Sequence, residues 1–243
     1  MYYYYITGTS RGIGRALAEK VLNDENNFIY GISRNEAIAH TRFEQITLDL
    51  ADIEKVTDFT FHQHKEAESV ILINNAGTLG KIIQVGRLEQ EEIITGFNVN
   101  SVAPAILMNK FISTYQDQCC KKIIINIGSA AGRKPQPSWS NYCSSKAALA
   151  MYSQVIAEEQ KDHDPAKRIN IFSVYPGLVE TNTQKLIRKT KLKNFKNARD
   201  FIAYKEFGLL SKPQEVAEII LTIINKYEEQ SGVLLDVRKM NKR

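Results

Sequence analysis

Cysteine is scarce in this 243-residue sequence, and its three residues form no C-x-x-C pair. Cys119, Cys120 and Cys143 are an odd number, and the first residues, MYYYYITG, contain neither a basic leader nor a small-residue cleavage site. Structural disulfides belong to exported proteins and oxidising compartments. We therefore expect reduced thiols and a cytoplasmic location.

Histidine is also sparse, and its spacing does not favour a metal site. Two of the four histidines, His62 and His64, lie in a segment whose pattern predicts a helix over 52–66. Side chains two positions apart on a helix point in different directions. We interpret both as solvated surface residues, and the sequence predicts no bound metal.

Long apolar runs are missing as well, since no segment approaches the ~20 residues that a membrane span requires. We expect no membrane partner. The net charge of +5 is concentrated in one segment, because 182–200 contains one acid and seven basic residues: Lys185, Arg188, Lys189, Lys191, Lys193, Lys196 and Arg199. This segment lacks the interleaved aromatic residues of a nucleic-acid stacking surface. We interpret it as a solvated helical face, with attraction of an anionic substrate or cofactor as the alternative, and expect no nucleic-acid partner.

Short apolar segments alternate with helical patterns along the whole chain. The patterns predict strands over 2–7, 28–33, 44–48, 69–74, 121–127, 169–175 and 232–236. They predict helices over 12–23, 52–66, 89–115, 140–160 and 213–227. This alternation indicates one α/β domain over 1–243, with a parallel sheet covered by helices on both faces and ligands beyond the carboxyl ends of the strands. Segment 178–212 has no predicted strand, so we expect a lid over the site.

A glycine-rich loop follows the first predicted strand in TGTSRGIGRALAEK. Glycine permits a tight turn and lets backbone N–H groups approach a pyrophosphate at a helix N-terminus. The spacing G-x-x-x-G-x-G differs from the commoner G-x-G-x-x-G fingerprint. A glycine-rich turn without a ligand is the alternative, but the place of the loop favours a nucleotide site. Its residues would be Gly8, Ser10, Arg11, Gly12, Ile13 and Gly14.

The end of the second predicted strand indicates which dinucleotide would bind. NAD-binding proteins usually have an acid there for the ribose 2′-hydroxyl, whereas this chain has Ser33 and Arg34. A guanidinium pairs well with a phosphate, so Arg34 would contact a 2′-phosphate with help from Arg11. Two surface arginines are the alternative. The missing acid predicts NADP(H).

Seven short motifs resemble those of the short-chain dehydrogenase/reductase family. They occur in the family's order across nearly the whole chain: TGTSRGIG at 7–14, LDL at 48–50, NNAG at 74–77, NVN at 98–100, GSAAG at 128–132, YCSSK at 142–146 and PGLVET at 176–181. The resemblance implies a seven-stranded, mainly parallel Rossmann sheet and nicotinamide-dependent carbonyl/alcohol chemistry on a small-molecule carbonyl substrate. One departure is Gly128, where the family often has a second serine.

The resemblance also implies roles for individual residues. Tyr142 would be the catalytic acid/base, Lys146 its partner, Ser129 the ligand of the substrate oxygen, and Asn100 the holder of a water that links Lys146 to solvent. The cofactor cleft would also include Asp49, Leu50, Asn75, Ala76, Gly77, Pro176, Gly177, Val179 and Thr181. The residues alone leave bland alternatives open: a turn serine for Ser129, a cap for Asn100 and a strand end for Asp49.

Elementary chemistry favours the same pair of residues. Tyr142 and Lys146 are one helical turn apart and share a face of the predicted helix. A free phenol has a pKa near ~10, and a neighbouring ammonium lowers it toward neutrality. A phenol placed in this way can donate a proton to the oxygen of a carbonyl that is being reduced.

The substrate is indicated by a narrower resemblance. The segment KPQPSWSNYCSSKAALAMYSQVIAEEQ and the later VYPGLVETNTQKLIRKT are most similar to the sepiapterin reductase and benzil reductase branch, which implies a vicinal diketone or a pterin side-chain ketone. Trp139 would stack on a flat substrate, with a core or interface tryptophan as the alternative. Asp236 lies four residues after Gly232, the spacing of the aspartate that anchors the pterin in sepiapterin reductases.

Two other functions stay open at this stage. One is a 3-oxoacyl or sugar reductase of the same family, for which the basic lid would suit a phosphorylated or carrier-linked substrate. The other is a nucleotide-sensing binding protein with little turnover, whose expected mark is loss of the tyrosine or the lysine. The helices predicted over 89–115 and 140–160 are the family's usual pairing faces, which implies a homodimer or homotetramer.

Overall fold

A seven-stranded sheet forms the centre of the computed structural model, which describes residues 1–36, 38–226, 232 and 234–240. The strand order is β3-β2-β1-β4-β5-β6-β7, and all six pairings are parallel. The strands are β1 (Tyr2–Thr7), β2 (Asn27–Ser33), β3 (Phe43–Thr47), β4 (Ser69–Asn74), β5 (Lys121–Ile127), β6 (Ile169–Tyr175) and β7 (Leu234–Asp236). This sheet confirms the predicted α/β class with seven mainly parallel strands.

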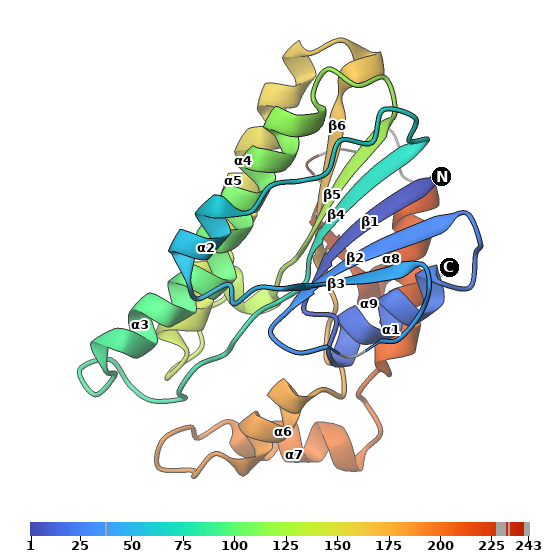
Figure 1. Ribbon diagram of the computed structural model, residues 1–243. Helices are drawn as coiled ribbons and strands as arrows, with labels where there is room; N and C mark the ends of the chain where they lie inside the picture. The colour runs from blue at the N-terminus through green and yellow to red at the C-terminus, as the bar shows by residue number, and fades with distance from the viewer. Residues whose placement is uncertain (37, 227–231, 233, 241–243) are drawn as a thin grey trace.

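Helices cover both faces of the sheet (Figure 1). One face packs on α1 (Gly12–Val21), α8 (Pro213–Lys226) and α9 (Val237–Met240). The other face packs on α2 (Ile53–Asp58), α4 (Ala103–Tyr115) and α5 (Ser140–Glu159). Because each face is covered, the central strands are continuous apolar runs; every residue of β4, SVILIN, is buried.

The helix predicted over 52–66 is wrong beyond its first turns, because α2 ends at Asp58. The next residues, FTFHQH, alternate with a period of two, so Phe59 and Phe61 both reach the core in an extended chain. His64 is not a solvated surface residue either. Its ring stacks on Tyr3 with a centroid distance of 3.7 Å, and its Nε2 lies 3.0 Å from the Tyr5 hydroxyl. Burial lowers the pKa of His64 to about 4.

The helix predicted over 89–115 is interrupted by a π-helical turn. It consists of α3 (Gln90–Phe97), a π-helix at Asn98–Val102 and then α4. Such turns are rare and are frequent at functional sites. Short 3-10 helices occur at Ala130–Gly132, Gln160–Asp162 and Pro165–Lys167. The helix predicted over 213–227 and the strand predicted over 232–236 include Tyr227 and Val233, which lie outside the described residues.

The predicted lid, 178–212, contains two helices, α6 (Asn182–Lys189) and α7 (Ala198–Glu206), which lie beyond the carboxyl ends of the strands (Figure 1). Its two ends meet at an isolated bridge between Val179 and Ser211, which we call the neck of the lid. The Ser211 N–H donates to the Leu178 carbonyl at 2.8 Å, and the Glu180 N–H donates to the Ser211 carbonyl at 3.0 Å. The lid is therefore an excursion of the chain that leaves and returns at one place.

Candidate active site

A cleft of about 800 Å³ lies between the carboxyl ends of the strands and the lid. It is lined by every residue predicted to bind cofactor or substrate except Gly14 and Asp236, and by all of the predicted catalytic residues except Asn100. A volume of this size is typical of ligand-binding clefts. The described residues contain no cluster of three or more His, Cys, Asp or Glu side chains that could hold a metal ion.

The glycine loop is shaped by backbone constraints at three positions. Gly8 and Gly12 have φ values of +76° and +59°, which disfavour other residues. A Cβ on Gly14 would lie 2.3 Å from the Gly8 carbonyl oxygen, so α1 can pack against the loop only because this side chain is missing. Gly14 therefore does not line the cleft but allows α1 to pack closely against the glycine loop.

Thr7, the last residue of β1, was not predicted as a site residue, and it connects the glycine loop to the segment after β4. The buried Thr7 hydroxyl accepts hydrogen bonds from the backbone N–H groups of Asn75 and Ala76, each at 2.9 Å. In return the Asn75 amide donates to the Thr7 carbonyl at 2.9 Å. A strand-end threonine before a glycine loop is the signal that could have identified it.

The residues at this end of the cleft fit a phosphorylated dinucleotide. Arg11, at the N-cap of α1, makes no side-chain capping bond, so no capping side chain covers the N-terminus of this helix. This is the arrangement that binds a pyrophosphate. At the end of β2 there is no acid; Ser33 is buried and bonds to the Asn35 carbonyl at 2.7 Å, while the Arg34 side chain is exposed. Arg34 forms a loose ion pair with Asp49, with 3.9 Å between its Nη1 and Oδ2 of the carboxylate, and its exposed guanidinium can still reach a phosphate.

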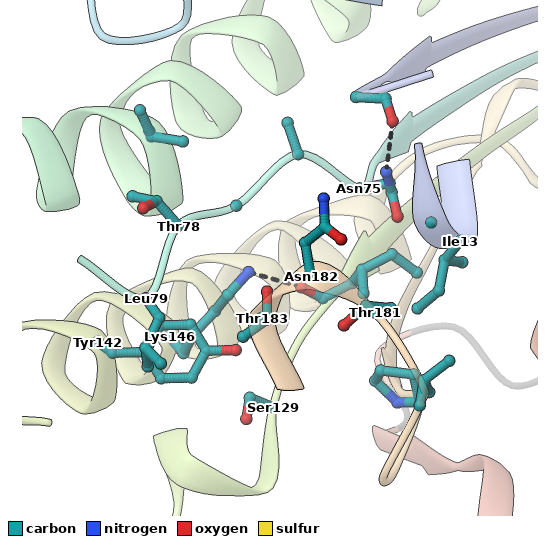
Figure 2. A pocket seen from close by; sticks show the side chains of 18 of the residues that line it. Ile13, Asn75, Thr78, Leu79, Ser129, Tyr142, Lys146, Thr181, Asn182 and Thr183 are labelled. Carbon is teal, nitrogen blue, oxygen red and sulfur yellow. Dashed lines mark hydrogen bonds between the residues drawn. The ribbon is translucent and has the colours of Figure 1, made fainter. Parts of the chain in front are cut away.

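Three side chains predicted to act in catalysis point into the cleft (Figure 2). Tyr142 is in the first turn of α5, and Lys146 lies one turn later, where its Nζ donates to the Ile127 carbonyl at 2.8 Å. Ser129 follows β5, and its hydroxyl oxygen accepts the Ala131 N–H at 3.2 Å. That bond fixes the orientation of Ser129 and leaves its own proton available to donate.

Burial shifts the pKa values of Tyr142 and Lys146 in opposite directions. It raises the pKa of Tyr142, an effect that a hydrogen bond with Ser129 reduces. It lowers the pKa of Lys146 from 10.5 to about 8. In the free protein near neutral pH, Tyr142 is therefore a phenol with a proton to give, and Lys146 is still mostly an ammonium.

The departure from the family pattern at Gly128 has a steric cause. A Cβ at this position would lie 2.4 Å from Cε1 of Tyr175, the last residue of β6. A second serine would therefore collide with this ring. The next residue, Ser129, is unaffected and lines the cleft.

Asn100 lies in the π-helical turn and is buried behind the cleft. Its Oδ1 accepts the Thr78 N–H at 2.8 Å, and its Nδ2 donates to the Thr78 carbonyl at 2.8 Å and to the Ser145 hydroxyl at 3.0 Å. The side chain thus joins the segment after β4 to α5 near Lys146. This geometry makes Asn100 a positioning residue, and the predicted water-holding role is not addressed by these contacts.

The substrate end of the cleft is apolar and aromatic. Trp139 packs edge-on to Tyr142, with ring centroids 5.9 Å apart, and stacks on Phe195 of the lid at 5.3 Å. Phe201 of α7 lies 5.7 Å from Trp139 and also lines the cleft. Trp139 therefore belongs to a buried cluster, as the alternative interpretation held, while part of it still lines the cleft.

Asp236 is not placed to bind substrate directly. Its carboxylate accepts two hydrogen bonds from the Arg238 guanidinium, at 2.9 Å from Nε and 2.6 Å from Nη2, which lowers the pKa of the carboxyl. Arg238 lines the cleft instead, next to Gly177, where a Cβ would lie 3.0 Å from Cγ of Arg238. Asp236 therefore does not line the cleft, contrary to the prediction of a substrate contact, because its carboxylate is used to hold Arg238.

Ser138 is a second residue of the site that was not predicted from the sequence. It has a φ of +69°, and its hydroxyl donates to the Asn194 carbonyl at 2.6 Å. It also precedes Trp139, so this strained residue connects the lid to the start of the catalytic helix. Nothing in its local sequence distinguishes it from the neighbouring serines.

Comparison with known proteins identifies the family. A family model described as short chain dehydrogenase matches residues 3–192. The chain is 35% identical to a benzil reductase ((S)-benzoin forming) of Bacillus cereus, over 98% of this chain and 99% of the relative, and 26% identical to the sepiapterin reductase of Xenopus tropicalis, over 95% and 94%. A short chain dehydrogenase/reductase structure from Saccharomyces cerevisiae shares the fold, with a TM-score of 0.82 at 21% identity over 98% of this chain and 96% of that one. The chain therefore belongs to the short-chain dehydrogenase/reductase family and is a nicotinamide-dependent oxidoreductase of the CH–OH/C=O class.

Proposed function

We propose that this protein is an NADPH-dependent reductase of vicinal diketones, with Tyr142 as the proton donor. The observation that carries the proposal is the convergence of Ser129, Tyr142 and Lys146 beside an aromatic pocket built by Trp139 and Phe201. The benzil reductase among its relatives supports the same substrate class.

The proposed mechanism divides the work among three side chains. The bound nicotinamide would supply a hydride to the carbonyl carbon. Ser129 donates a hydrogen bond to the carbonyl oxygen, which stabilises the negative charge that develops there. Tyr142 donates its phenolic proton to the same oxygen. The ammonium of Lys146, one helical turn away on the same helix, would stabilise the phenolate that Tyr142 becomes once it has given up its proton.

The preference for NADPH rests on the end of β2. Arg34 and Arg11 both line the cleft and would pair with a 2′-phosphate, while no acid directly follows Ser33 to accept a bond from a ribose hydroxyl. In the variant Arg34→Asp, the ratio of kcat/KM with NADPH to that with NADH should fall at least tenfold. The exposed Arg87, which is outside the cleft, provides the matched control Arg87→Asp. An unchanged ratio in Arg34→Asp would remove this residue from the cofactor site.

Polar groups at the substrate end suit a molecule with a second oxygen. The Tyr175 hydroxyl and the Gln184 amide oxygen belong to residues that line the cleft, and neither has a hydrogen-bond partner among the described residues. A buried polar group without a partner is costly. A diketone whose second carbonyl accepts a bond from Tyr175 would relieve one of these costs, which a simple monoketone would not.

A keto acid or another anionic carbonyl compound is the second candidate, on the evidence of charge. Asp49 is the one acid among the described residues that line the cleft, and it lies at the end predicted to hold adenosine, whereas Lys134 and Arg238 line the other end. Both cations would attract a carboxylate or phosphate on the substrate. Such a substrate would favour the hypothesis of a 3-oxoacyl or sugar reductase over that of a diketone reductase.

The decisive experiment is NADPH oxidation by the purified protein with a panel of carbonyl compounds. The panel contains benzil, 1-phenyl-1,2-propanedione, sepiapterin and a 3-oxoacyl thioester, each also tested with NADH. Preferential turnover of the two diketones with NADPH is expected. Turnover of the thioester alone would overturn the substrate class but keep the mechanism, and NADPH binding without any turnover would favour a nucleotide-sensing protein.

We also propose a homo-oligomer and a cytoplasmic location. Exposed apolar side chains lie on two neighbouring helices, Ile93 and Ile94 on α3 and Met151 and Val155 on α5. The helices are joined by Asn141, whose amide donates to the Glu92 carbonyl at 2.7 Å. A twofold contact would bury this face, and sedimentation of Met151→Glu as a smaller species than the parent would support it. The three free cysteines accord with a reducing compartment.

A further inference from the structure

The lid carries the whole positive excess of the protein. Residues 178–212 contain nine basic and three acidic residues, whereas the remaining 208 positions contain 23 basic and 24 acidic ones. The lid therefore has a formal charge of +6 and the rest of the chain −1. A balanced body with one strongly basic segment indicates that the charge serves a local purpose rather than solubility in general.

Most of these cations have no ion-pair partner among the residues that the structure describes. Arg188 and Lys205 bond to Glu180, at 2.8 Å and 3.0 Å, and so hold α6 and α7 to the neck. The other seven are exposed and form no ion pair with any described residue: Lys185, Lys189, Lys191, Lys193, Lys196, Arg199 and Lys212. Their mutual electrostatic repulsion destabilises the folded lid, and a bound anionic surface would relieve it.

The same segment exposes large apolar side chains among its cations. Phe207 is 76% exposed and Leu209 is 58% exposed, and they flank Gly208 at the end of α7. Leu192 and Ile202 are also exposed. Exposed apolar residues next to unpaired lysines are typical of segments that lie in the interface of a membrane with anionic lipids.

We propose that the outer surface of the lid binds the surface of an anionic lipid bilayer. Phe207 and Leu209 would enter the interfacial region while the seven unpaired cations contact lipid head groups. A second copy of this chain is a poor occupant, because two surfaces of like charge repel each other. Nucleic acid is also disfavoured, since Phe207 is the one strongly exposed aromatic ring among the lid residues and successive bases need several.

Such a contact requires no membrane-spanning segment. Among the described residues, no helix combines the length and apolar character that crossing a bilayer needs, and the expectation of no membrane partner rested on that criterion alone. The inner side of the lid lines the substrate end of the cleft through Ile187 and Phe201. A lid seated on lipid would therefore place the cleft beside a phase in which neutral aromatic ketones concentrate.

The test is co-sedimentation of the full-length protein with vesicles of phosphatidylglycerol and phosphatidylcholine, compared with phosphatidylcholine alone. The protein should sediment with the anionic vesicles, and less so as salt increases. Each basic residue near an anionic surface contributes roughly a fivefold factor. The triple variant Lys189→Gln, Lys193→Gln, Lys196→Gln should therefore lower the partition coefficient by roughly 100-fold.

Matched controls separate this surface from charge and hydrophobicity in general. Lys55→Gln, Lys65→Gln, Lys161→Gln removes the same charge from exposed positions on the body and should leave binding within about twofold. Phe207→Ser, Leu209→Ser should weaken binding at least tenfold, whereas Val85→Ser, also 76% exposed, should not. The proposal is overturned if anionic vesicles do not bind, if both triple variants bind equally, or if polyglutamate or single-stranded DNA binds while vesicles do not. None of these readings depends on turnover, so they stand apart from the proposed reductase activity.

Discussion

The cofactor end and the substrate end of the cleft are built in different ways. At the cofactor end, backbone geometry dominates: Gly8 and Gly12 adopt positive φ, and Gly14 makes room for the packing of α1. At the substrate end, side chains dominate, since Trp139 and Phe201 meet across the boundary between body and lid. A backbone-built site tolerates few changes in its key residues, whereas a site built by packed side chains can be altered one contact at a time.

The largest effect is expected between these two ends, at the proton donor. Tyr142→Phe should reduce kcat at least 10³-fold, because the phenyl ring keeps the packing with Trp139 and loses only the hydroxyl that donates the proton. NADPH affinity, measured by fluorescence titration, should change less than threefold. The control is Tyr152→Phe, an exposed tyrosine on the same helix, which should leave kcat unchanged. A Tyr142→Phe protein with near-parental kcat would contradict the proposed chemistry.

A smaller but still large effect is expected at the glycine loop. In Gly14→Ala the new methyl would lie 2.3 Å from the Gly8 carbonyl oxygen, so the loop must shift. Overpacking of this kind costs about 1–3 kcal/mol of unfolding free energy, and NADPH affinity should fall at least tenfold. Gly86→Ala is the control for NADPH affinity: no heavy atom lies within 4 Å of its added Cβ and Gly86 does not line the cleft, so this variant tests only the strain of a side chain at a φ of +89°. If the two variants have the same unfolding free energy by chemical denaturation and the same NADPH affinity by titration, the glycine loop accommodates the added methyl group and the prediction is wrong.

The pH dependence of kcat/KM should show whether the charge of Lys146 is needed for the reaction. Its pKa of about 8 means that the ammonium is lost above that pH, so kcat/KM for reduction should fall about tenfold per unit at higher pH. Stability should move the other way. An unfolded lysine stays protonated to about 10.5, so between the two values the unfolded chain binds more protons and this residue's contribution to stability rises with pH. Loss of activity together with unfolding above pH 8 would assign the effect to other groups.

The smallest effect is expected at the base of the lid. Glu180→Gln removes the charge that holds Arg188 and Lys205, both partly exposed pairs worth little individually. KM for benzil should rise about two- to fivefold, while kcat and NADPH affinity stay the same, because the lid contributes packing and not chemistry. Glu206→Gln, an exposed lid acid with no ion pair among the described residues, is the control. An equal effect on NADPH affinity would show that the two ends are coupled.

The sequence predicted most of what backbone chemistry controls. The strands were found within a residue or two of their observed bounds, because parallel strands covered on both faces are long apolar runs. The glycine loop was predicted from its place after the first strand. The pairing of Tyr142 with Lys146 was predicted from their spacing together with the resemblance to the family. The helix over 52–66 was wrong because Phe59 and Phe61 obey a period of two inside a segment that otherwise resembles a helix.

What the sequence could not predict depends on distant contacts. Asp236 has the spacing of a substrate ligand, but its partner, Arg238, is decided by the short helix that follows β7. Thr7 and Ser138 act through residues 68 and 56 positions away, Asn75 and Asn194. Neither partner is visible from local pattern, since both bonds form only once the sheet and the lid are in place.

The neck of the lid gives the protein a particular kind of evolutionary freedom. The lid begins after Val179 and ends before Ser211, and these two residues pair with each other. The positions of β6 and α8 therefore do not depend on the number of residues between these two. Doubling the length of such a closed excursion costs only about 0.6 kcal/mol of chain entropy. Insertion, deletion or replacement of the part of this segment that follows Thr181 can therefore change which carbonyl compounds are admitted while the nucleotide-binding half keeps its stability. An enzyme of this design acquires new substrates by exchanging one continuous stretch of sequence, without rebuilding its catalytic residues.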